Sequence, residues 1–308
     1  MVSAEPVFPS IVRPFRLEGS NVRGKLVRLG ATYADILAAH EYPPIVAELL
    51  GETLALSAAL STSLKYDGTF ILQTSSDGPV RMLVADVTSE GGMRAYARYR
   101  PEDIIAVPPR EGLVPRLLGS GHIAFTVDQG PDTARYQGIT ALEGETLSDV
   151  AVAYFRQSEQ LETEIMLAAD PGTGGGAARA AALMLQRLPK PERSILDPEE
   201  DEEAWRNAVV LMKSMTANEM LDPNLSTNGL LYRLYHENGV RVFDGKPLRF
   251  ACRCSREKVA RTLAAFSPED LQDMKTDEGL IVATCEFCRA EYSFDDPQLE
   301  ELRKGALE

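Results

Sequence analysis

All four cysteines of the chain lie in its C-terminal part and form two close pairs. Cys252 and Cys254 are separated by one residue, and Cys285 and Cys288 by two. Thirty residues stand between the pairs, and the first 251 residues contain no cysteine. Cysteines used as ordinary core residues are scattered, whereas two close pairs joined by a loop supply the four thiolates of a tetrahedral zinc shell. The spacing therefore predicts one zinc ion held by four thiolates.

The residues alone leave three interpretations of these thiolates open. An inert structural zinc knuckle is one, because four protein sulfurs leave no position for a catalytic water. A redox switch is another, because each thiolate has a near neighbour that can capture its sulfenic acid as a disulfide. A thioredoxin-like oxidoreductase ranks last, since Cys285 follows no βαβ pattern and two thiols outside its pair would have no role.

Residues 251–308, which contain both pairs, form a module too small to depend on a hydrophobic core alone. Ser255 is expected to cap one helix, and Ser267 with Pro268 behind it to begin a second. Both helices fall between the cysteine pairs, and residues 280–282 are expected to form a short strand that leads into the second pair. Zinc binding contributes roughly 10–16 kcal/mol to such small domains, so we expect the metal to hold the module together.

Residues 1–188 are predicted to form an α+β core domain of sheets and helices. Strands that come in hairpins, with helices grouped between them, favour this class over a doubly wound parallel sheet. The expected strands are 22–29, a hairpin of 79–87 and 93–99, 122–128 and 135–142. The expected helices are a buried one within 42–64 and an amphipathic one at 147–157, capped by Ser148 and Asp149.

Residues 189–250 are predicted to form a helical linker between core and C-terminal module. A proline-punctuated acidic stretch after Pro189 marks the boundary. Asp197, followed by Pro198, is expected to begin a helix, because the acidic residues after it would stabilise the positive N-terminal end of the helix dipole. A second helix is expected near 230–235. The first helix carries Trp205 on an apolar face that needs a partner, so the linker should dock on another surface. An ordinary helical extension of the core is the alternative.

Composition narrows the possible partners and location. The net charge of −14 disfavours nucleic acid and anionic lipid, and no basic run offsets it. No apolar run approaches the roughly 20 residues of a membrane helix, and the N-terminus lacks the regions of a signal peptide. We therefore expect a cytoplasmic protein that binds neither nucleic acid nor membrane. In that reducing compartment clustered cysteines bind metal or serve redox chemistry.

Other candidate sites are weak. The glycine-rich run 171–176 is expected to precede a helix, but no Gly-Lys-Ser/Thr follows, so a flexible loop is favoured over a phosphate loop. Residues 119–121 are better explained as a turn. His40, His122 and His236 are dispersed, and each is expected to be a surface or packing residue. The chain is therefore not expected to be an enzyme.

Several segments match the pattern of a known family. They are 250–257, 285–288 with Tyr292 and Phe294 after it, and the segments 136–138, 154–160, 185–189 and 231–237. Over nearly its whole length the chain thus resembles the HslO family of redox-regulated 33-kilodalton heat-shock chaperones. One departure is the pair Ala181 and Ala182, where the family leads us to expect two glycines, and this bears on the packing of the expected local helix.

The resemblance implies an ATP-independent holdase that is inactive while reduced and zinc-bound. It implies that Cys252, Cys254, Cys285 and Cys288 bind zinc, and that oxidation links Cys252 to Cys254 and Cys285 to Cys288. Zinc loss should then unfold the C-terminal module, undock the linker and expose apolar surface to unfolded client proteins. The resemblance also implies a homodimer in the oxidised state. A binding protein with a constitutive structural zinc knuckle is the alternative.

Overall fold

The computed structural model describes residues 8–62, 66–104, 112–130, 133, 135–189 and 197–298. The chain divides into two compact units, Met1–Phe250 and Ala251–Glu308. The described residues mix two large antiparallel-rich sheets with helices, which confirms the predicted α+β class.

The first sheet of the N-terminal unit, sheet A, is antiparallel throughout and has the order β10-β1-β2-β9-β8, with β11 also paired to β1. Its edge strands β10 and β11 come from the segment predicted to be a helical linker. That segment is therefore not helical throughout, because its last part completes the sheet. The strands are β1 (Ile11–Leu17), β2 (Val22–Leu29), β8 (Thr163–Asp170), β9 (Arg179–Arg187), β10 (Val240–Val242) and β11 (Lys246–Pro247).

The second sheet, sheet B, has the order β12-β5-β4-β3-β6-β7. The predicted hairpin is confirmed as β4 and β5, and Gly91 in its turn has a positive φ of 84° that favours glycine. Strand β12 joins the edge parallel to β5. The strands are β3 (Thr69–Ser76), β4 (Val80–Thr88), β5 (Gly92–Tyr99), β6 (Gly121–Asp128), β7 (Tyr136–Ala141) and β12 (Arg249–Phe250).

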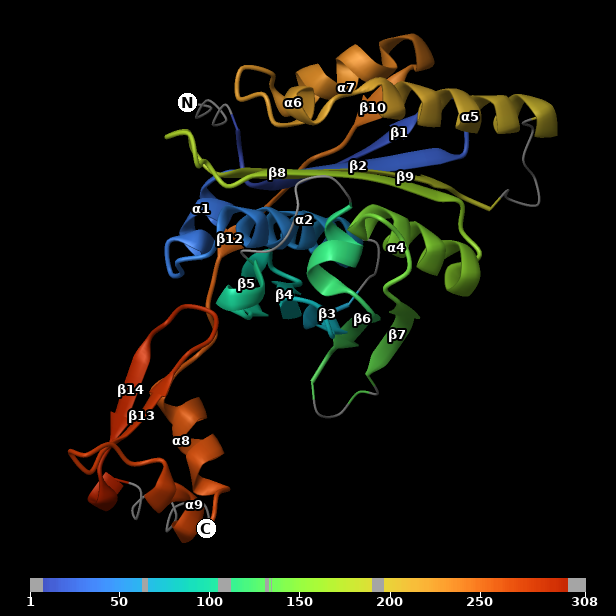
Figure 1. The fold of residues 1–308 in the computed structure, drawn as a ribbon. Helices are drawn as coiled ribbons and strands as arrows, with labels where there is room; N and C mark the ends of the chain where they lie inside the picture. The colour runs from blue at the N-terminus through green and yellow to red at the C-terminus, as the bar shows by residue number, and fades with distance from the viewer. Residues whose placement is uncertain are drawn as a thin grey trace. The chain divides into compact units, whose positions relative to one another are not determined.

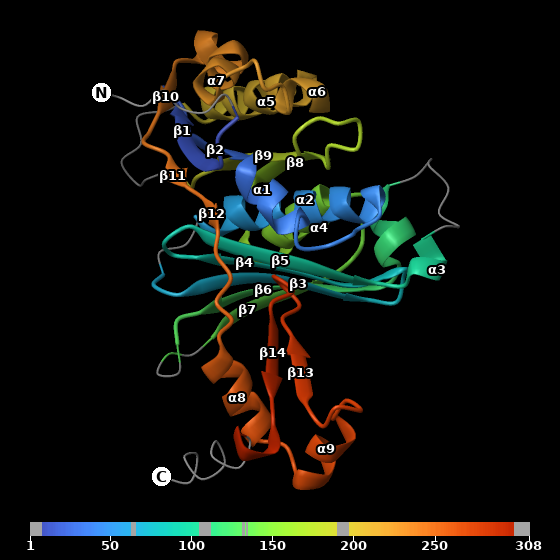
Figure 2. The ribbon, with the colours of Figure 1, turned by 90° about the vertical axis from the view of Figure 1, so that its left-hand side faces the viewer.

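Helix α2 (Pro44–Ser61) lies between the two sheets and contacts both (Figures 1 and 2). Its side chains are mostly apolar and are buried on most of its faces, as expected for a core helix. By length and composition α2 resembles a membrane span, but 78% of it is buried inside the protein. Its composition is thus explained by its place in the core. The other core helices are α1 (Ala31–Leu37), α3 (Pro101–Ile104) and α4 (Leu147–Tyr154), with π-helical turns at Val114–Leu118 and Phe155–Glu159.

The predicted start of α4 needs a correction. Thr146, and not Ser148, is the cap: its hydroxyl accepts a hydrogen bond from Asp149 N at 3.1 Å, and the Asp149 carboxylate accepts one from Thr146 N at 2.9 Å. Asp149 is therefore the third residue of a capping box. The helix ends at Tyr154, and the following turn is π-helical.

The expectation of a helix after the glycine-rich run is wrong. Residues 171–176 connect β8 to β9, so strand β9 follows them. Ala181 and Ala182 lie within that strand and are fully buried, one in each of the two apolar clusters that sandwich sheet A. The small residues at these positions thus affect the packing of a strand and not of a helix.

Three further helices, α5 (Pro198–Ser214), α6 (Ala217–Met220) and α7 (Thr227–Tyr235), cover the face of sheet A that is turned away from α2 (Figure 1). The predicted helix starts are confirmed: Asp197 caps α5 by accepting from Glu199 N at 2.8 Å. A 3-10 turn at His236–Asn238 ends this helical segment. The C-terminal unit contains α8 (Arg256–Ala264), α9 (Pro268–Asp273), β13 (Ile281–Thr284) and β14 (Glu291–Phe294).

Candidate metal centre

The first cysteine pair lies directly before helix α8. Ser255 caps this helix by accepting from Lys258 N at 3.3 Å, so the chain is extended up to residue 255 and helical after it. Lys258 also donates from Nζ to the carbonyl of Arg253 at 2.7 Å, which holds the segment between the two cysteines. The helix start thus fixes where Cys252 and Cys254 lie.

The second pair occupies the turn of the β13–β14 hairpin. Thr284 pairs with Glu291 in the last register of the hairpin. Cys285 N donates to Ala290 O at 2.9 Å, and Arg289 N donates back to Cys285 O at 2.8 Å. Arg289 has a φ of 59°, an unusual conformation for a residue with a side chain, which closes the turn. The hairpin therefore presents both thiols of Cys285 and Cys288 on one tight turn.

The structure brings the four sulfurs together. All four Sγ atoms lie within 4.8 Å of one another. Cys252 Sγ is 3.4 Å from Cys254 Sγ and 3.7 Å from Cys285 Sγ, and Cys254 Sγ is 3.4 Å from Cys288 Sγ. A Zn–S bond of about 2.3 Å places the sulfurs of a tetrahedral site roughly 3.8 Å apart. The four thiols are free, and their spacing fits a zinc site.

The environment of the thiols shifts their pKa values in opposite directions. Burial raises the pKa of Cys252 and of Cys288. Burial acts in the same direction on Cys254, but hydrogen bonds from the Tyr292 hydroxyl and from Cys288 outweigh it and lower the pKa of Cys254 to about 7. Tyr292 Oη donates to Cys254 Sγ at 3.2 Å. A bound divalent cation would favour the thiolate form of the remaining cysteines.

The C-terminal unit has a small apolar core. Its buried members are Ala260, Leu263, Leu271, Ile281 and Phe294. Arg256 covers Phe294 with its guanidinium, 4.3 Å from the ring centroid. A core of this size supplies little stability on its own, so a metal bound by the four cysteines is expected to contribute most of it.

The three histidines form no site together. His40 stacks on Tyr42, His122 lies on β6, and His236 follows the last turn of α7, where its Nδ1 contacts the Tyr232 carbonyl at 3.1 Å. Each is a packing or surface residue, as predicted. Within the described ranges, the four cysteines are the group suited to hold a metal ion.

A second feature concerns the face of sheet A beneath helices α5, α6 and α7, which we call the covered face. The Phe15 and Tyr235 rings stack with centroids 5.6 Å apart. Gly24 makes room for this stack, because a Cβ there would lie 2.1 Å from Phe15 Cζ. Trp205, the single tryptophan of the chain, is 8% exposed against the same surface. The covered face comprises Phe15, Leu17, Val22, Leu26, Ala168, Ala181, Leu183 and Leu185.

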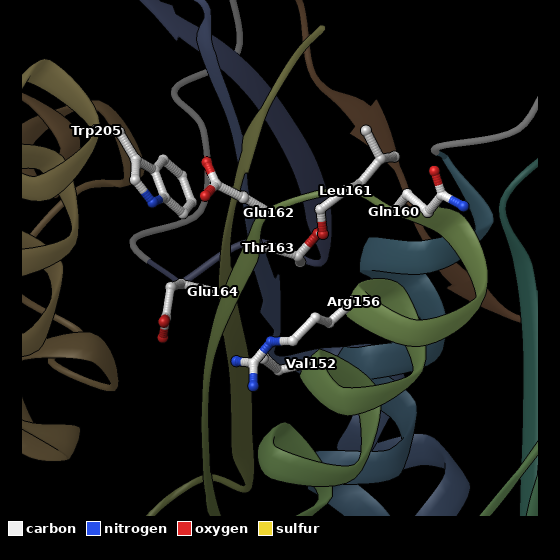
Figure 3. Close-up of a pocket in the computed structure, with 8 residues that line it drawn as sticks. All are labelled: Val152, Arg156, Gln160, Leu161, Glu162, Thr163, Glu164 and Trp205. Carbon is white, nitrogen blue, oxygen red and sulfur yellow. The ribbon is translucent and has the colours of Figure 1, made fainter. Parts of the chain in front are cut away.

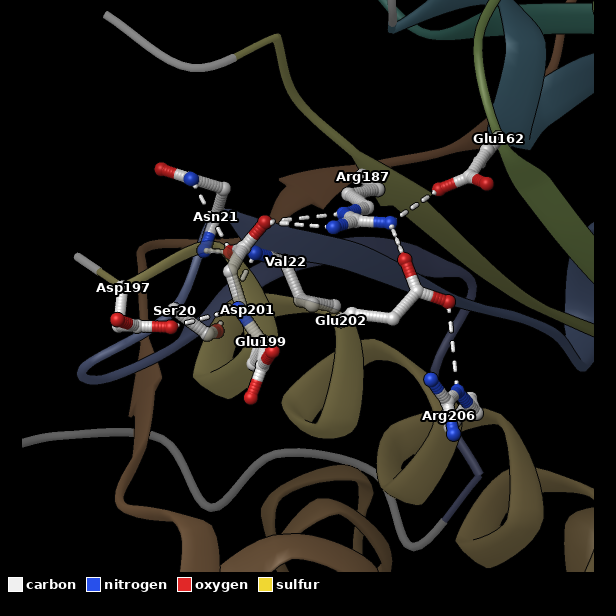
Figure 4. Close-up of polar contacts among 10 residues, drawn as sticks. All are labelled: Ser20, Asn21, Val22, Glu162, Arg187, Asp197, Glu199, Asp201, Glu202 and Arg206. Atoms are coloured by element: carbon white, nitrogen blue, oxygen red, sulfur yellow. Dashed lines mark hydrogen bonds and ion pairs between the residues drawn. The ribbon is translucent and has the colours of Figure 1, made fainter. Parts of the chain in front are cut away.

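Buried polar contacts fix the helices on the covered face. Asp201 in α5 is 1% exposed and accepts from Arg187 Nε at 3.0 Å and from Asn21 N at 3.2 Å (Figure 4). Arg187 also pairs with Glu202 of α5 at 2.5 Å. Arg28, which is fully buried, donates to the carbonyls of Met220, at 3.3 Å, and of Leu225. Polar groups of the sheet and of its β1–β2 connection thus hold the first turn of α5, the end of α6 and the α6–α7 connection.

Sequence reasoning missed these contacts and the role of Tyr292. Arg28 lies near the end of the largely buried strand β2 and Arg187 ends β9, and a charged residue in a buried strand is a signal that it has a specific partner. The partner itself could not be read from the sequence, because Arg28 and Leu225 are 197 positions apart.

Comparisons with known proteins agree with this arrangement. The model of the family described as "Hsp33 protein" matches residues 11–295. A protein named "33 kDa chaperonin" from Caulobacter vibrioides (strain NA1000 / CB15N) is 42% identical over 297 residues, covering 94% of this chain and 96% of the relative. One of the same name from Pseudomonas syringae pv. tomato is 43% identical over 303 residues, covering 97% and 95%.

The fold also matches a solved structure. The crystal structure of the 33 kDa chaperonin (heat shock protein 33 homolog) from Thermotoga maritima has a TM-score of 0.77 and 22% identity, covering 97% of this chain and 99% of that one. The relatives bear the names of chaperones and not of enzymes, in agreement with the sequence prediction. The chain belongs to the Hsp33 family of chaperones.

Proposed function

We propose that this protein is a redox-regulated, ATP-independent holdase. The observation that carries the proposal is the meeting of four free thiols at zinc-binding distances in a unit with a very small core. In the same chain an apolar sheet face is covered by helices that precede this unit. A metal-dependent fold and a coverable apolar surface are the two parts that a switched chaperone needs.

Cys252, Cys254, Cys285 and Cys288 are the proposed ligands of one zinc ion, which supplies the cross-link between the first pair and the hairpin. Oxidation joins Cys252 to Cys254 and Cys285 to Cys288. Each pair of thiolates gives up two electrons and forms one S–S bond, while one hydrogen peroxide takes these electrons and two protons and becomes two waters. The sulfurs lose their negative charge in this step and can no longer hold the metal.

The chain connectivity suggests how zinc loss leads to exposure of the covered face. We propose a core of residues 1–188, a linker of 189–250 and a switch of 251–308. Strand β12 ends at Phe250, two residues before Cys252, so unfolding of the switch removes the folded anchor at the linker's C-terminal end. The helices α5, α6 and α7 then leave the covered face, which becomes available to the apolar segments of unfolded clients.

The proposed setting follows from the same chemistry. A thiol switch of this kind operates in the reducing cytoplasm, where its resting state is reduced. An exposed apolar face gives a reason for dimerisation of the oxidised form. Unfolded proteins are the proposed partners, and neither nucleic acid nor membrane is among them.

Suppression of client aggregation tests the proposal. The reduced, zinc-loaded protein and a peroxide-treated sample are each added to a chemically denatured client, and light scattering is followed without ATP. We expect protection only from the oxidised sample, and its loss after reduction with zinc present. Equal protection by both samples, or none by either, would contradict the switch and favour a constitutive structural zinc knuckle.

A further inference from the structure

Three core segments that carry the family resemblance, and that the proposed switch does not use, meet at one place. They are residues 136–138 on β7, 154–160 around the π-helical turn, and 185–189 at the end of β9. Tyr136 Oη and Tyr154 Oη donate to the same oxygen of Glu159, at 2.7 and 2.9 Å. A Cβ at Gly138 would lie 2.1 Å from Tyr154 Oη, so this strand must carry glycine for the tyrosine to fit.

The three segments enclose a pocket of about 100 Å³ in the N-terminal unit. Its walls are largely aromatic and come from Phe70, Phe125, Tyr136, Tyr154 and Phe155. The Phe125 and Tyr154 rings lie 4.7 Å apart at 44°, and Tyr154 and Phe155 meet nearly edge-on at 73°. An apolar cavity of about 150 Å³ accepts benzene, so this smaller pocket has room for no more than a single ring.

One wall of the pocket carries an arginine whose hydrogen-bonding capacity is incompletely used. Arg23, on β2, donates from Nη2 to Gln186 Oε1 at 3.0 Å, and Gln186 donates in turn to Thr163. The Arg23 Nε atom is buried and has no partner among the described residues. Arg23 also forms no ion pair with a described acid, and Arg16 lies opposite it on β1. Burial lowers the pKa of Arg23.

The charges around the pocket therefore favour an anion beside Arg23. Glu159, the acid that lines the pocket, is held by two phenol hydroxyls and forms no ion pair with Arg23. A carboxylate in the pocket accepts a charge-assisted hydrogen bond from the guanidinium of Arg23, which lines the pocket, and compensates its half-buried charge. We propose that this pocket binds a small aromatic carboxylate, with its ring between the aromatic walls and its carboxylate on Arg23.

A second pocket next to the π-helical turn provides a control. It measures about 420 Å³ and is lined by Arg156, Thr163 and Trp205 among others (Figure 3). Figure 3 shows Arg156 reaching from the π-helical turn toward β8, into this second pocket. Arg156 is exposed and does not line the aromatic pocket. It is a matched arginine on a neighbouring site.

Isothermal titration of the full-length, reduced and zinc-loaded protein tests the proposal with phenylacetate and its neutral analogue phenylacetamide. We expect phenylacetate to bind about tenfold more tightly, because a charge-assisted hydrogen bond replaces a neutral one. Arg23→Gln should abolish this preference, whereas Arg156→Gln should leave it unchanged. Trp205 emission and zinc content show whether each variant is folded.

The comparison of phenylacetate with phenylacetamide on the unaltered protein tests the preference for a carboxylate even if Arg23→Gln fails to fold. In that case Arg23→Lys, which keeps the charge, is expected to retain a preference for the acid. Equal affinity for acid and amide would overturn the proposal, as would an absence of binding up to about 10 mM, a concentration at which even weak ligands are detected. An unchanged preference in folded Arg23→Gln would also overturn it.

Discussion

Arg187 on strand β9 and Asp201 on helix α5 form a buried ion pair in which Nε and Nη2 both donate to one carboxylate oxygen, at 3.0 and 2.9 Å. The other oxygen of Asp201 accepts from the backbone and side-chain nitrogens of Asn21. The first turn of the helical segment is thus held on the covered face by a charge that has little access to water.

Replacing Arg187 with alanine should loosen this segment. Removing one partner of a buried pair typically costs about 3–5 kcal/mol, because the other charge stays buried without compensation. We expect Arg187→Ala to protect clients at lower peroxide concentration than the unaltered protein. Arg206→Ala is the control, since Arg206 is exposed and, among the described residues, its ion pair is with Glu202. Identical peroxide dependence in both variants would show that the ion pair does not restrain the helices.

The hydroxyl of Tyr292 is expected to strengthen metal binding through Cys254. Outer partners of metal ligands commonly change affinity by 10–100-fold, so Tyr292→Phe should weaken zinc binding by roughly tenfold. Competition with a chromogenic chelator measures this directly. As a control, Tyr232→Phe, at an exposed position on α7, should bind zinc as tightly as the unaltered protein. An unchanged zinc affinity in Tyr292→Phe would mean that the hydrogen bond to sulfur has no role.

Loss of one thiol should have the effect of oxidation without an oxidant. Cys285→Ser leaves three sulfurs, so the hairpin supplies one proposed metal ligand instead of two. We expect zinc content to fall, circular dichroism to report lost helix from α8 and α9, and clients to be protected under reducing conditions. Thr284→Ser, the adjacent residue, should behave normally. If the variant lost zinc but did not protect clients, zinc loss would not be sufficient to activate the protein, and this prediction would be wrong.

The core contains an acid that should make stability depend on pH. Burial, with a smaller contribution from Glu48, raises the pKa of Glu52 from 4.5 to about 7. The folded state therefore prefers the protonated acid, and stability is lost as pH rises from about 4.5 through 7. The free energy of unfolding of Glu52→Gln should exceed that of the unaltered protein by about 1–3 kcal/mol at pH 8 and equal it near pH 4. Urea unfolding at both pH values checks this, with exposed Glu41→Gln as control.

Local signals in the sequence predicted much of the fold. Asp197, Ser255 and Ser267 cap helices as expected, and the 79–87 and 93–99 runs form a hairpin, because caps and turns depend on neighbouring residues. The grouping of cysteines likewise indicated a common site. The cap of α4 was misplaced because an aspartate near a helix start can be either the cap itself or the third residue of a capping box. Asp149 is the latter, and Thr146 is the cap.

What the sequence did not reveal depends on distant partners. A helix was expected after the glycine-rich run 171–176, yet residues 179–187 form a strand because β2 and β8 pair on its two sides. Residues 240–247 were assigned to a helical linker, but they complete sheet A at its edge. The pairing of Arg187 with Asp201 and the contact of Tyr292 with Cys254 appear only once these elements are folded.

The central claim is that metal loss in the C-terminal unit releases the helices from the covered face. Trp205 in α5 is the only tryptophan and is 8% exposed, so its emission reports this release. Zinc release to a chromogenic chelator and Trp205 emission should be followed together in the reduced, zinc-loaded protein during peroxide treatment at raised temperature. We predict a red shift that accompanies or follows zinc release, together with client protection. Complete zinc release with unchanged Trp205 emission and full client protection would contradict the account.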